Sequence, residues 1–224
     1  MYPSNEQAIV TKKLLLRQTS EILRAVYDDK AFYPQNSLFI ISTLTNEMDL
    51  KFLLSLLNSK LIHFIYQINN PQEGKIFAEV KPSVVNKLPI KKVSLSEQQP
   101  FIFLADKMLS LHSELQTKRQ TFLDWLAVKN NIKITGALKR FDKDEIDFNE
   151  FVAEMNKQVK RYSPEQRVEW LKYFDQYRGE CRELARHIKN TDREIDRMVY
   201  NLYGLTPEEV IMVEGENPSN INHS

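Results

Sequence analysis

A run of mostly hydrophobic residues, spaced alternately three and four apart, constrains the fold of this chain most. The spacing is kept without a miss at nine positions: Phe174, Tyr177, Cys181, Leu184, Ile188, Thr191, Ile195, Met198 and Leu202. A seven-residue repeat sustained over four repeats predicts a long helix that pairs with another helix as a coiled coil. Ser163 and Pro164 carry the signals for the start of this helix, and Gly204 for its end.

A second helical pattern follows residue 94. Ser96 and Gln99 have the spacing of a capping box. A hydrophobic stripe then runs, with a break at Lys118, through Phe101, Leu104, Met108, Leu111, Leu115, Phe122 and Leu126. Two helices of roughly 30 and 40 residues would span about 45–60 Å, which is too long for a compact core. An antiparallel coiled-coil pair is therefore expected, with an ordinary helical bundle as the alternative.

Shorter elements complete the C-terminal part. Residues 129–143 are expected to form a long connection, and Asp147 with Glu150 predicts the capped start of a short helix. Thr206 and Pro207 predict the start of a last helix, and residues 216–224 are expected to be disordered.

The first ninety residues have a different pattern. Runs rich in β-branched and apolar residues predict strands at 12–17, 21–27, 37–43 and 76–80, with an edge segment at 88–90. Residues 48–66 have helical spacing, with a break at Asn58 and Ser59. The predicted fold class is therefore α+β: a small mixed α/β domain over 1–94, a helical region over 95–215 and a tail over 216–224.

Composition excludes several functions. The five glycines are scattered, so the chain has neither a phosphate-binding P-loop nor a dinucleotide-binding turn, which need clustered glycines. Cys181 is the only cysteine, which excludes an internal disulfide and favours a reducing, cytoplasmic setting. The richest apolar stretch is too short to span a membrane, so no membrane partner is expected.

The formal net charge of +1 conceals an uneven distribution. Residues 1–94 hold twelve Lys and Arg against eight Asp and Glu, a net of +4, whereas the remainder has a net of −3. A basic part joined to a mildly acidic part suggests two different tasks.

Catalytic and metal-binding patterns are weak. The four histidines are far apart, with no metal-ligand spacing to a cysteine or carboxylate, and Cys181 on the helical stripe is expected to be a small core residue. Asp142, Asp144 and Asp147 lack the glycine and glutamate of a calcium loop. Glu79 and Lys81 match half of a metal-dependent nuclease signature, and a solvent-facing strand end is the usual alternative.

Several stretches together resemble a known family. They are residues 13–19, 25–28, 36–41, the LLNSKL segment at 56–61, the LPI segment at 88–90 with Ser96–Gln98, and the closing residues 191–206. In this order they resemble the TaqI-like C-terminal specificity domain of type IIG, Eco57I-like restriction–modification enzymes, which is related to type I specificity subunits.

The resemblance implies a recognition module for double-stranded DNA that positions an adenine-directed DNA methyltransferase. The chain lacks the NPPY-type tetrapeptide and the glycine-rich loop of the methyltransferase. We therefore expect no catalysis and no cofactor in this chain. S-adenosylmethionine and Mg²⁺ would belong to a methyltransferase or nuclease domain, in the same parent protein or in a separate subunit.

The residue types in the basic part are compatible with DNA binding, because cations replace the counterions of phosphates and Arg, Asn and Gln can read base edges. The candidate DNA-binding residues are Lys12, Lys13, Arg17, Gln18, Arg24, Lys60, Asn70, Gln72, Lys75, Lys81 and Lys87. The alternative function is a protein–protein scaffold, in which the coiled-coil helices bind another subunit.

Overall fold

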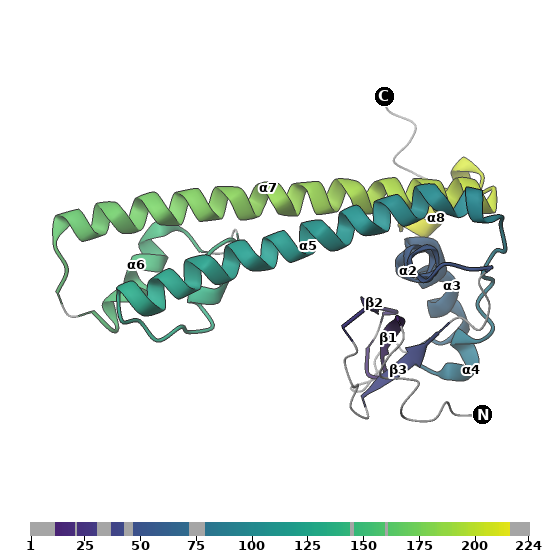
Figure 1. The fold of residues 1–224 in the computed structure, drawn as a ribbon, viewed down its shortest axis with the longest axis horizontal. Coiled ribbons are helices and arrows are strands. Elements are labelled where there is room, and N and C mark those ends of the chain that lie inside the picture. The colour runs from purple at the N-terminus through teal and green to yellow at the C-terminus, as the bar shows by residue number, and fades with distance from the viewer. Residues whose placement is uncertain are drawn as a thin grey trace. The chain divides into compact units, whose positions relative to one another are not determined.

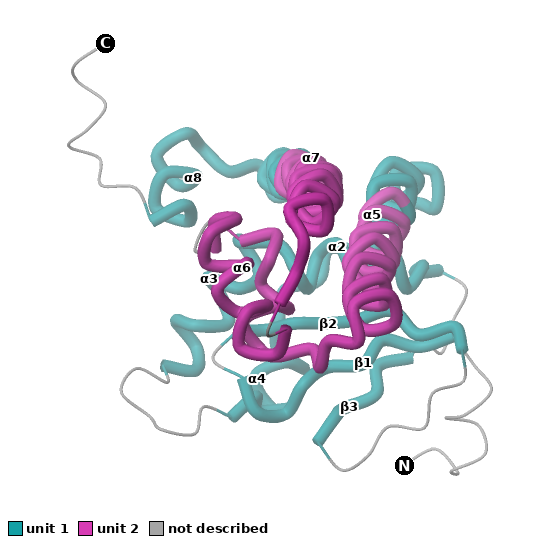
Figure 2. The backbone as a smooth tube through the Cα atoms, turned by 90° about the vertical axis from the view of Figure 1, so that its left-hand side faces the viewer, with its two compact units in different colours: residues 1–106, 192–224 teal, residues 107–191 magenta. Residues whose placement is uncertain are grey.

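The structure, a computed structural model, describes residues 12–20, 22–30, 37–42, 47–71, 79–143, 146–159 and 161–215. It is an α+β protein with one small sheet and two very long helices (Figure 1). The chain forms two compact units, coloured separately in Figure 2: unit 1 holds residues 1–106 and 192–224, and unit 2 holds residues 107–191. The sequence-based division at residue 94 stays a prediction.

The sheet of unit 1 contains three antiparallel strands in the order β2–β1–β3. They are β1 (Lys13–Arg17), β2 (Ala25–Asp28) and β3 (Leu38–Ile41), close to three of the predicted strands. Leu16 of the central strand β1 pairs with Ala25 of β2 and with Phe39 of β3. The C-terminal end of β1 therefore meets the start of both neighbouring strands.

Two helices pack beside this sheet. They are α2 (Leu50–Asn58), which contacts β1 and β2, and α3 (Lys60–Asn69). Phe52, Leu56 and Ile62 are fully buried and supply much of the apolar core. The predicted break between the helices is confirmed, because Ser59 caps α3 by accepting a hydrogen bond from the Ile62 amide.

The predicted edge strand at residues 88–90 is wrong. The preceding segment forms a short helix, α4 (Pro82–Val85), in which Pro82 occupies the first turn and so loses no backbone bond. Leu88, which follows this helix, has a buried side chain. Its carbonyl accepts a hydrogen bond from the Ile90 amide, two residues away, and not from the amide of a neighbouring strand. The predicted strand at 76–80 lies mostly outside the described residues, although Glu79 forms a β-bridge with Thr19.

The first long helix, α5 (Leu95–Lys129), begins earlier than predicted. Its capping box is formed by Ser94 and Glu97, which exchange backbone-to-side-chain hydrogen bonds, and not by Ser96 and Gln99. Gln98 is instead buried, where its side chain accepts from the Asp49 amide and donates to the Glu47 carbonyl. Pro100 therefore lies inside the helix, beyond the first turn.

In unit 2 the second long helix, α7 (Pro164–Tyr203), runs antiparallel to α5. Lys118 pairs with Glu180 at 2.7 Å, Trp125 stacks against Tyr173 with ring centroids 4.5 Å apart, and Lys129 pairs with Glu169. The residue numbers of the partners therefore decrease along α7 as they increase along α5, as expected for antiparallel helices. The break in the α5 stripe at Lys118 is explained by its pairing with Glu180.

Between these helices the chain forms a turn of 3-10 helix, η1 (Leu138–Arg140), and helix α6 (Phe148–Asn156). The predicted capping box of Asp147 and Glu150 is present at the start of α6. The core of unit 2 is largely aromatic, with Phe122, Phe141, Phe151, Phe174 and Trp170 all buried. Phe122 contacts Phe141 and Phe151, so α5, η1 and α6 share one core.

The end of α7 and helix α8 (Pro207–Glu214) belong to unit 1. Gly204 has a φ of 71° and ends α7, and Thr206 caps α8, as predicted. The buried Asp196 accepts a hydrogen bond of 2.9 Å from the Lys60 amide at the start of α3. The predicted disordered tail, 216–224, lies outside the described residues.

Candidate nucleic-acid interface

The end of strand β1 brings three separate segments together. The Gln18 amide donates to the Ser37 carbonyl at 3.0 Å, and the Val80 amide donates to the Gln18 carbonyl at 2.7 Å. The bridge between Thr19 and Glu79 adds a further contact. Lys81, which is far from Arg17 and Gln18 in the sequence, is therefore held near them by backbone hydrogen bonds.

Arg24 lies at the same end of the sheet. It immediately precedes Ala25, which pairs with Leu16, the residue before Arg17. The Asn58 side chain fixes this position, because its Oδ1 accepts from the Ala25 amide at 2.8 Å and its Nδ2 donates to the Ala25 carbonyl at 3.0 Å. In the sequence, Asn58 indicates only a break between two helices, so this bidentate contact was not predicted.

We call Arg17, Gln18, Arg24 and Lys81 the strand-end cluster. The three cations are exposed, and Gln18 is half-buried. Arg and Lys can neutralise phosphates, whereas the amide of Gln can pair with an adenine and Arg with a guanine. Glu79 is an exposed acidic residue next to Lys81, so the cluster is not uniformly basic.

His63 of α3 interacts electrostatically with Arg24 of this cluster. Its pKa is lowered by burial and, to a smaller extent, by the positive charge of Arg24. At neutral pH the imidazole is therefore uncharged, and the basic character of the cluster comes from Arg17, Arg24 and Lys81.

Asn70 was predicted to read bases, and the structure contradicts this. Its side chain is buried, and its Nδ2 donates to the Tyr66 hydroxyl at 2.6 Å and to the Glu79 carbonyl at 3.2 Å. The Tyr66 hydroxyl also accepts from the Lys81 amide at 3.3 Å. Asn70 and Tyr66 thus hold residues 79–81 against α3. Tyr66 had only helical spacing in the sequence and was not predicted to position this segment.

Lys13 was also predicted to contact DNA, and it cannot do so in this fold. Its side chain is 0% exposed, and its Nζ lies 2.7 Å from Asp28 Oδ2. The two residues face each other across β1 and β2. Lys13 therefore serves the interior of unit 1, because its ammonium group forms an ion pair with a buried carboxylate.

The remaining predicted residues are not gathered in the strand-end cluster. Lys12 is exposed at the opposite end of β1, and Lys60 forms an ion pair with Glu214 of α8. Lys87 is exposed after α4, where the described contacts do not join it to Arg17. Gln72 and Lys75 lie outside the described residues.

No metal-binding group is assembled among the described residues. They contain no group of three His, Cys, Asp or Glu side chains that could hold a metal ion. His187 Nε2 lies 3.0 Å from Glu183 Oε1 on an exposed face of α7, a contact that the sequence did not predict. Burial raises the pKa of the Cys181 thiol to about 11, which fits the predicted core role.

No described helix is both long enough and apolar enough to cross a membrane.

Comparison with known proteins finds a matching family model for each of two parts of the chain. Residues 2–90 match the TaqI-like C-terminal specificity domain, as the sequence resemblance implied. Residues 94–199 match a domain of unknown function, DUF8810. No curated protein and no solved structure matches the chain.

Proposed function

Because residues 2–90 match the TaqI-like C-terminal specificity domain, we propose that the chain recognises a specific sequence in double-stranded DNA. The observation that carries the proposal is the strand-end cluster, in which backbone hydrogen bonds bring Lys81 beside the segment that holds Arg17 and Gln18. A sheet end that presents cations and an amide can contact phosphates and base edges together.

Within this cluster we assign two kinds of contact. Arg17 and Gln18 read bases, because Arg can bind both acceptors of a guanine and Gln both polar groups of an adenine. Arg24 and Lys81 contact phosphates, which adds affinity without sequence information. Asn70 and Tyr66 act as positioning residues that keep Lys81 beside Gln18.

The partner in this proposal is an adenine-specific DNA methyltransferase of a restriction–modification system, as in type IIG enzymes. The specificity module would place that enzyme on its target and supply no catalytic group, so that S-adenosylmethionine and Mg²⁺ belong to the partner. The partner would be a domain of the same parent protein or a separate subunit, and both would act in the cytoplasm.

Salt-titrated binding to duplex DNA tests this proposal. Affinity should fall steeply as the salt concentration rises, and Arg17→Ala should reduce discrimination between target and non-target duplexes by roughly 10- to 100-fold. Lys81→Ala should weaken binding to both duplexes and lower the salt slope by about 0.9. Lys12→Ala is the matched control, since Lys12 lies at the other end of β1.

Absence of salt-dependent DNA binding, both alone and with the methyltransferase supplied, would overturn the proposal. A tight homodimer that ignores DNA would instead support the scaffold function, which the long antiparallel helices of unit 2 favour. Sedimentation of the full chain, with and without a duplex, separates these two functions.

A further inference from the structure

The net charges of the two compact units differ from those of the two sequence regions, residues 1–94 and the remainder. Residues 107–191, which form unit 2, hold seventeen Lys and Arg against thirteen Asp and Glu, a net of +4. Unit 1 holds fourteen against seventeen, a net of −3, because the acidic residues after 191 return to it. The helical unit, and not the unit with the specificity domain, therefore carries the excess of positive charge.

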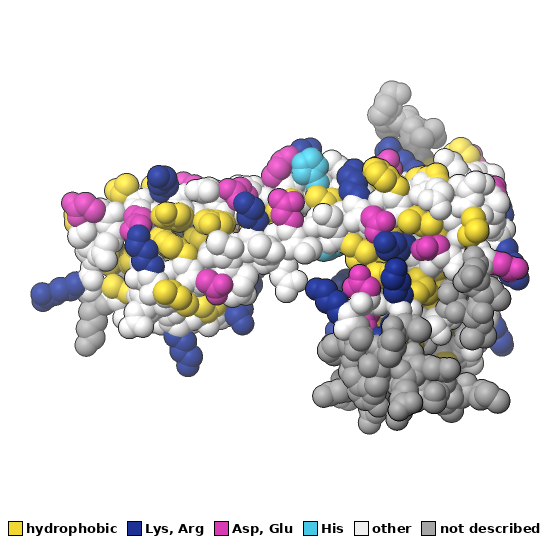
Figure 3. Space-filling model, viewed as in Figure 1, with side chains coloured by type: hydrophobic (Ala, Val, Ile, Leu, Met, Phe, Trp, Pro, Cys, Tyr) yellow, Lys and Arg dark blue, Asp and Glu magenta, His cyan; other side chains and the backbone are white. Residues whose placement is uncertain are grey.

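Much of this charge lies where α5 ends and α7 begins. Two segments meet there, residues 129–137 and 156–163, which we call the tip segments. Together they contain five Lys and Arg and no Asp or Glu: Lys129, Lys133, Lys157, Lys160 and Arg161. Seen from the front, dark-blue side chains project from the free end and the lower border of unit 2 (Figure 3).

Hydrogen bonds tie the two tip segments together. The Lys133 amide donates to Gln158 Oε1 at 2.8 Å, and Gln158 Nε2 donates back to the Lys133 carbonyl at 3.0 Å. Asn130 accepts a hydrogen bond of 2.8 Å from the indole of the buried Trp170. The tip segments are therefore anchored to each other and to α7, so their cations are presented by a fixed backbone.

Apolar and polar side chains of the tip segments point in opposite directions. Ile132 is buried, and Val159 and Tyr162 are half-buried against the core of unit 2. The exposed side chains are all polar or cationic: Lys129, Asn131, Lys133, Asn156, Lys157, Gln158, Arg161 and Ser163. A protein-binding surface usually needs buried aromatic or aliphatic anchors, whereas phosphate contacts use this set of side chains.

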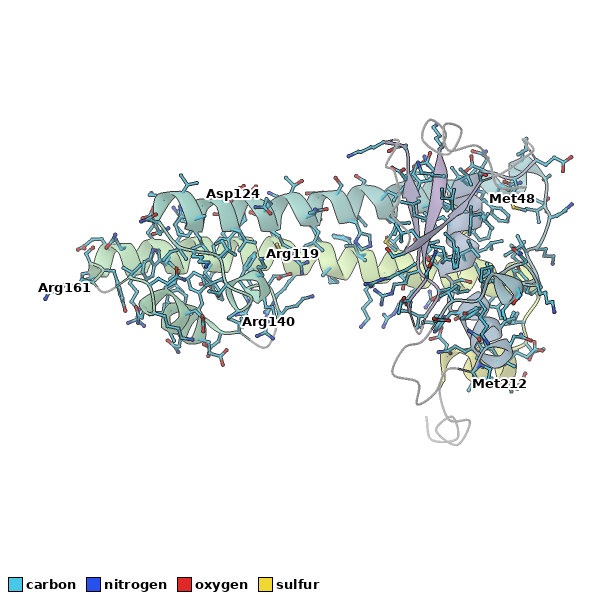
Figure 4. All side chains as sticks on the ribbon, turned by 90° about the horizontal axis from the view of Figure 1, so that it is seen from below. Met48, Arg119, Asp124, Arg140, Arg161 and Met212 are labelled. Atoms are coloured by element: carbon cyan, nitrogen blue, oxygen red, sulfur yellow. The ribbon has the colours of Figure 1, made fainter. Side chains whose placement is uncertain are left out.

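Neighbouring acidic residues compensate only part of the charge. Glu169 pairs with Lys129, and Glu154 pairs with Lys157. Among the residues that the structure describes, no ion pair engages Lys133 or Arg161, and both are exposed. Arg161 extends away from the helices at the free end of unit 2 (Figure 4).

We propose that the tip segments of unit 2 form a second DNA-contact surface, which binds the phosphate backbone through Lys133 and Arg161. This inference rests on the proposed function, and it extends DNA binding beyond the specificity domain into the DUF8810 region. The contact reads no bases. It adds affinity equally to target and non-target duplexes, and each phosphate contact releases counterions.

The test compares two double variants of the full chain in salt-titrated binding to a target and a non-target duplex. In Lys133→Gln/Arg161→Gln the slope of log affinity against log salt should fall by about 1.8, with equal loss of affinity on both duplexes. Lys107→Gln/Lys189→Gln removes two exposed cations from the helices of the same unit and should leave the slope unchanged. Thermal unfolding confirms that both variants fold.

The proposal that the tip segments contact DNA is overturned if the salt slope is unchanged in Lys133→Gln/Arg161→Gln. It is also overturned if the slope falls equally in the Lys107→Gln/Lys189→Gln control. The proposed function survives that result if the wild-type chain binds its target selectively and Arg17→Ala reduces the selectivity. If the wild-type chain binds no duplex, alone or with its methyltransferase, both proposals fail.

Discussion

Lys13 and Asp28 form a buried ion pair across β1 and β2, with Lys13 Nζ 2.7 Å from Asp28 Oδ2. Removing one member leaves the other charge buried without its partner, which costs about 3–5 kcal/mol. Lys13→Ala should therefore lower the free energy of unfolding of unit 1 by that amount, measured by urea denaturation. Lys13→Met/Asp28→Leu should recover most of the loss. A Lys13→Ala variant of normal stability with a reduced salt slope for DNA would contradict the pair's structural role.

Asn70 should affect DNA discrimination without contacting DNA. Asn70→Ala removes the hydrogen bonds to the Tyr66 hydroxyl and the Glu79 carbonyl, so residues 79–81 keep only the Tyr66 hydroxyl of their two anchors to α3. We expect a loss of about 1–2 kcal/mol in unfolding free energy and roughly 10-fold weaker discrimination between duplexes. Asn69→Ala is the control, because Asn69 is exposed and its side chain donates to the Ile65 carbonyl of its own helix. Equal effects of the two substitutions would contradict this account.

Asp196 should make the stability of unit 1 depend on pH. Burial raises the pKa of this carboxyl from 3.8 to about 6, with Asp192 and Glu214 adding to the rise and the Lys60 amide opposing it. Between those two pKa values the folded state binds more protons than the unfolded state, so this contribution to stability falls as pH rises from about 4 to 6.

Asp196→Asn removes that ionisation and can keep the hydrogen bond from the Lys60 amide. The variant should be more stable than the wild type at pH 7 by about 2 kcal/mol, with the difference vanishing near pH 4. Thermal unfolding across this range measures the difference, and Glu194→Gln on the exposed face of α7 is the control. A difference that does not change with pH would contradict the buried-acid explanation.

Arg119 should stabilise unit 2 far more than a surface arginine does. Its Nε donates to Asp142 Oδ2 at 2.9 Å, and the Asp142 side chain is only 4% exposed (Arg119 is labelled in Figure 4). Arg119→Ala should lower the unfolding free energy by about 2 kcal/mol, because it leaves the buried Asp142 carboxylate without its arginine partner. Arg186→Ala, which breaks an exposed pair with Glu183 on α7, should change the unfolding free energy much less, because solvent screens exposed ion pairs. Similar losses in chemical denaturation would contradict this ranking.

The helical part of the fold was largely predictable because its signals are local. The three-and-four spacing of residues 174–202 and the capping residues Asp147, Ser163 and Thr206 each specify an element within a few positions. The start of α5 was misplaced because two overlapping capping patterns are present, Ser94 with Glu97 and Ser96 with Gln99, and the helix uses the first. The contacts of Gln98 with Asp49 and Glu47 span about fifty residues, and no local pattern reveals them.

The candidate site was only partly predictable, for the same reason. Arg17, Gln18 and Lys81 have the right chemistry in the sequence, but hydrogen bonds between distant segments decide that they meet. Residue type alone could not separate exposed Lys12 from buried Lys13, since the partner that buries Lys13 lies on another strand. The net positive charge of unit 2 could not be seen by counting charges along the sequence, because the acidic residues after 191 belong to unit 1.

The most direct test of DNA recognition is repeated selection of the full chain, together with the proposed methyltransferase partner, from a pool of randomised duplexes. We predict that independent selections enrich the same short sequence, and that Arg17→Ala relaxes the preference at one base pair while Lys12→Ala leaves it intact. Duplexes that bind but share no common sequence would contradict the assignment of this chain as a sequence-reading module.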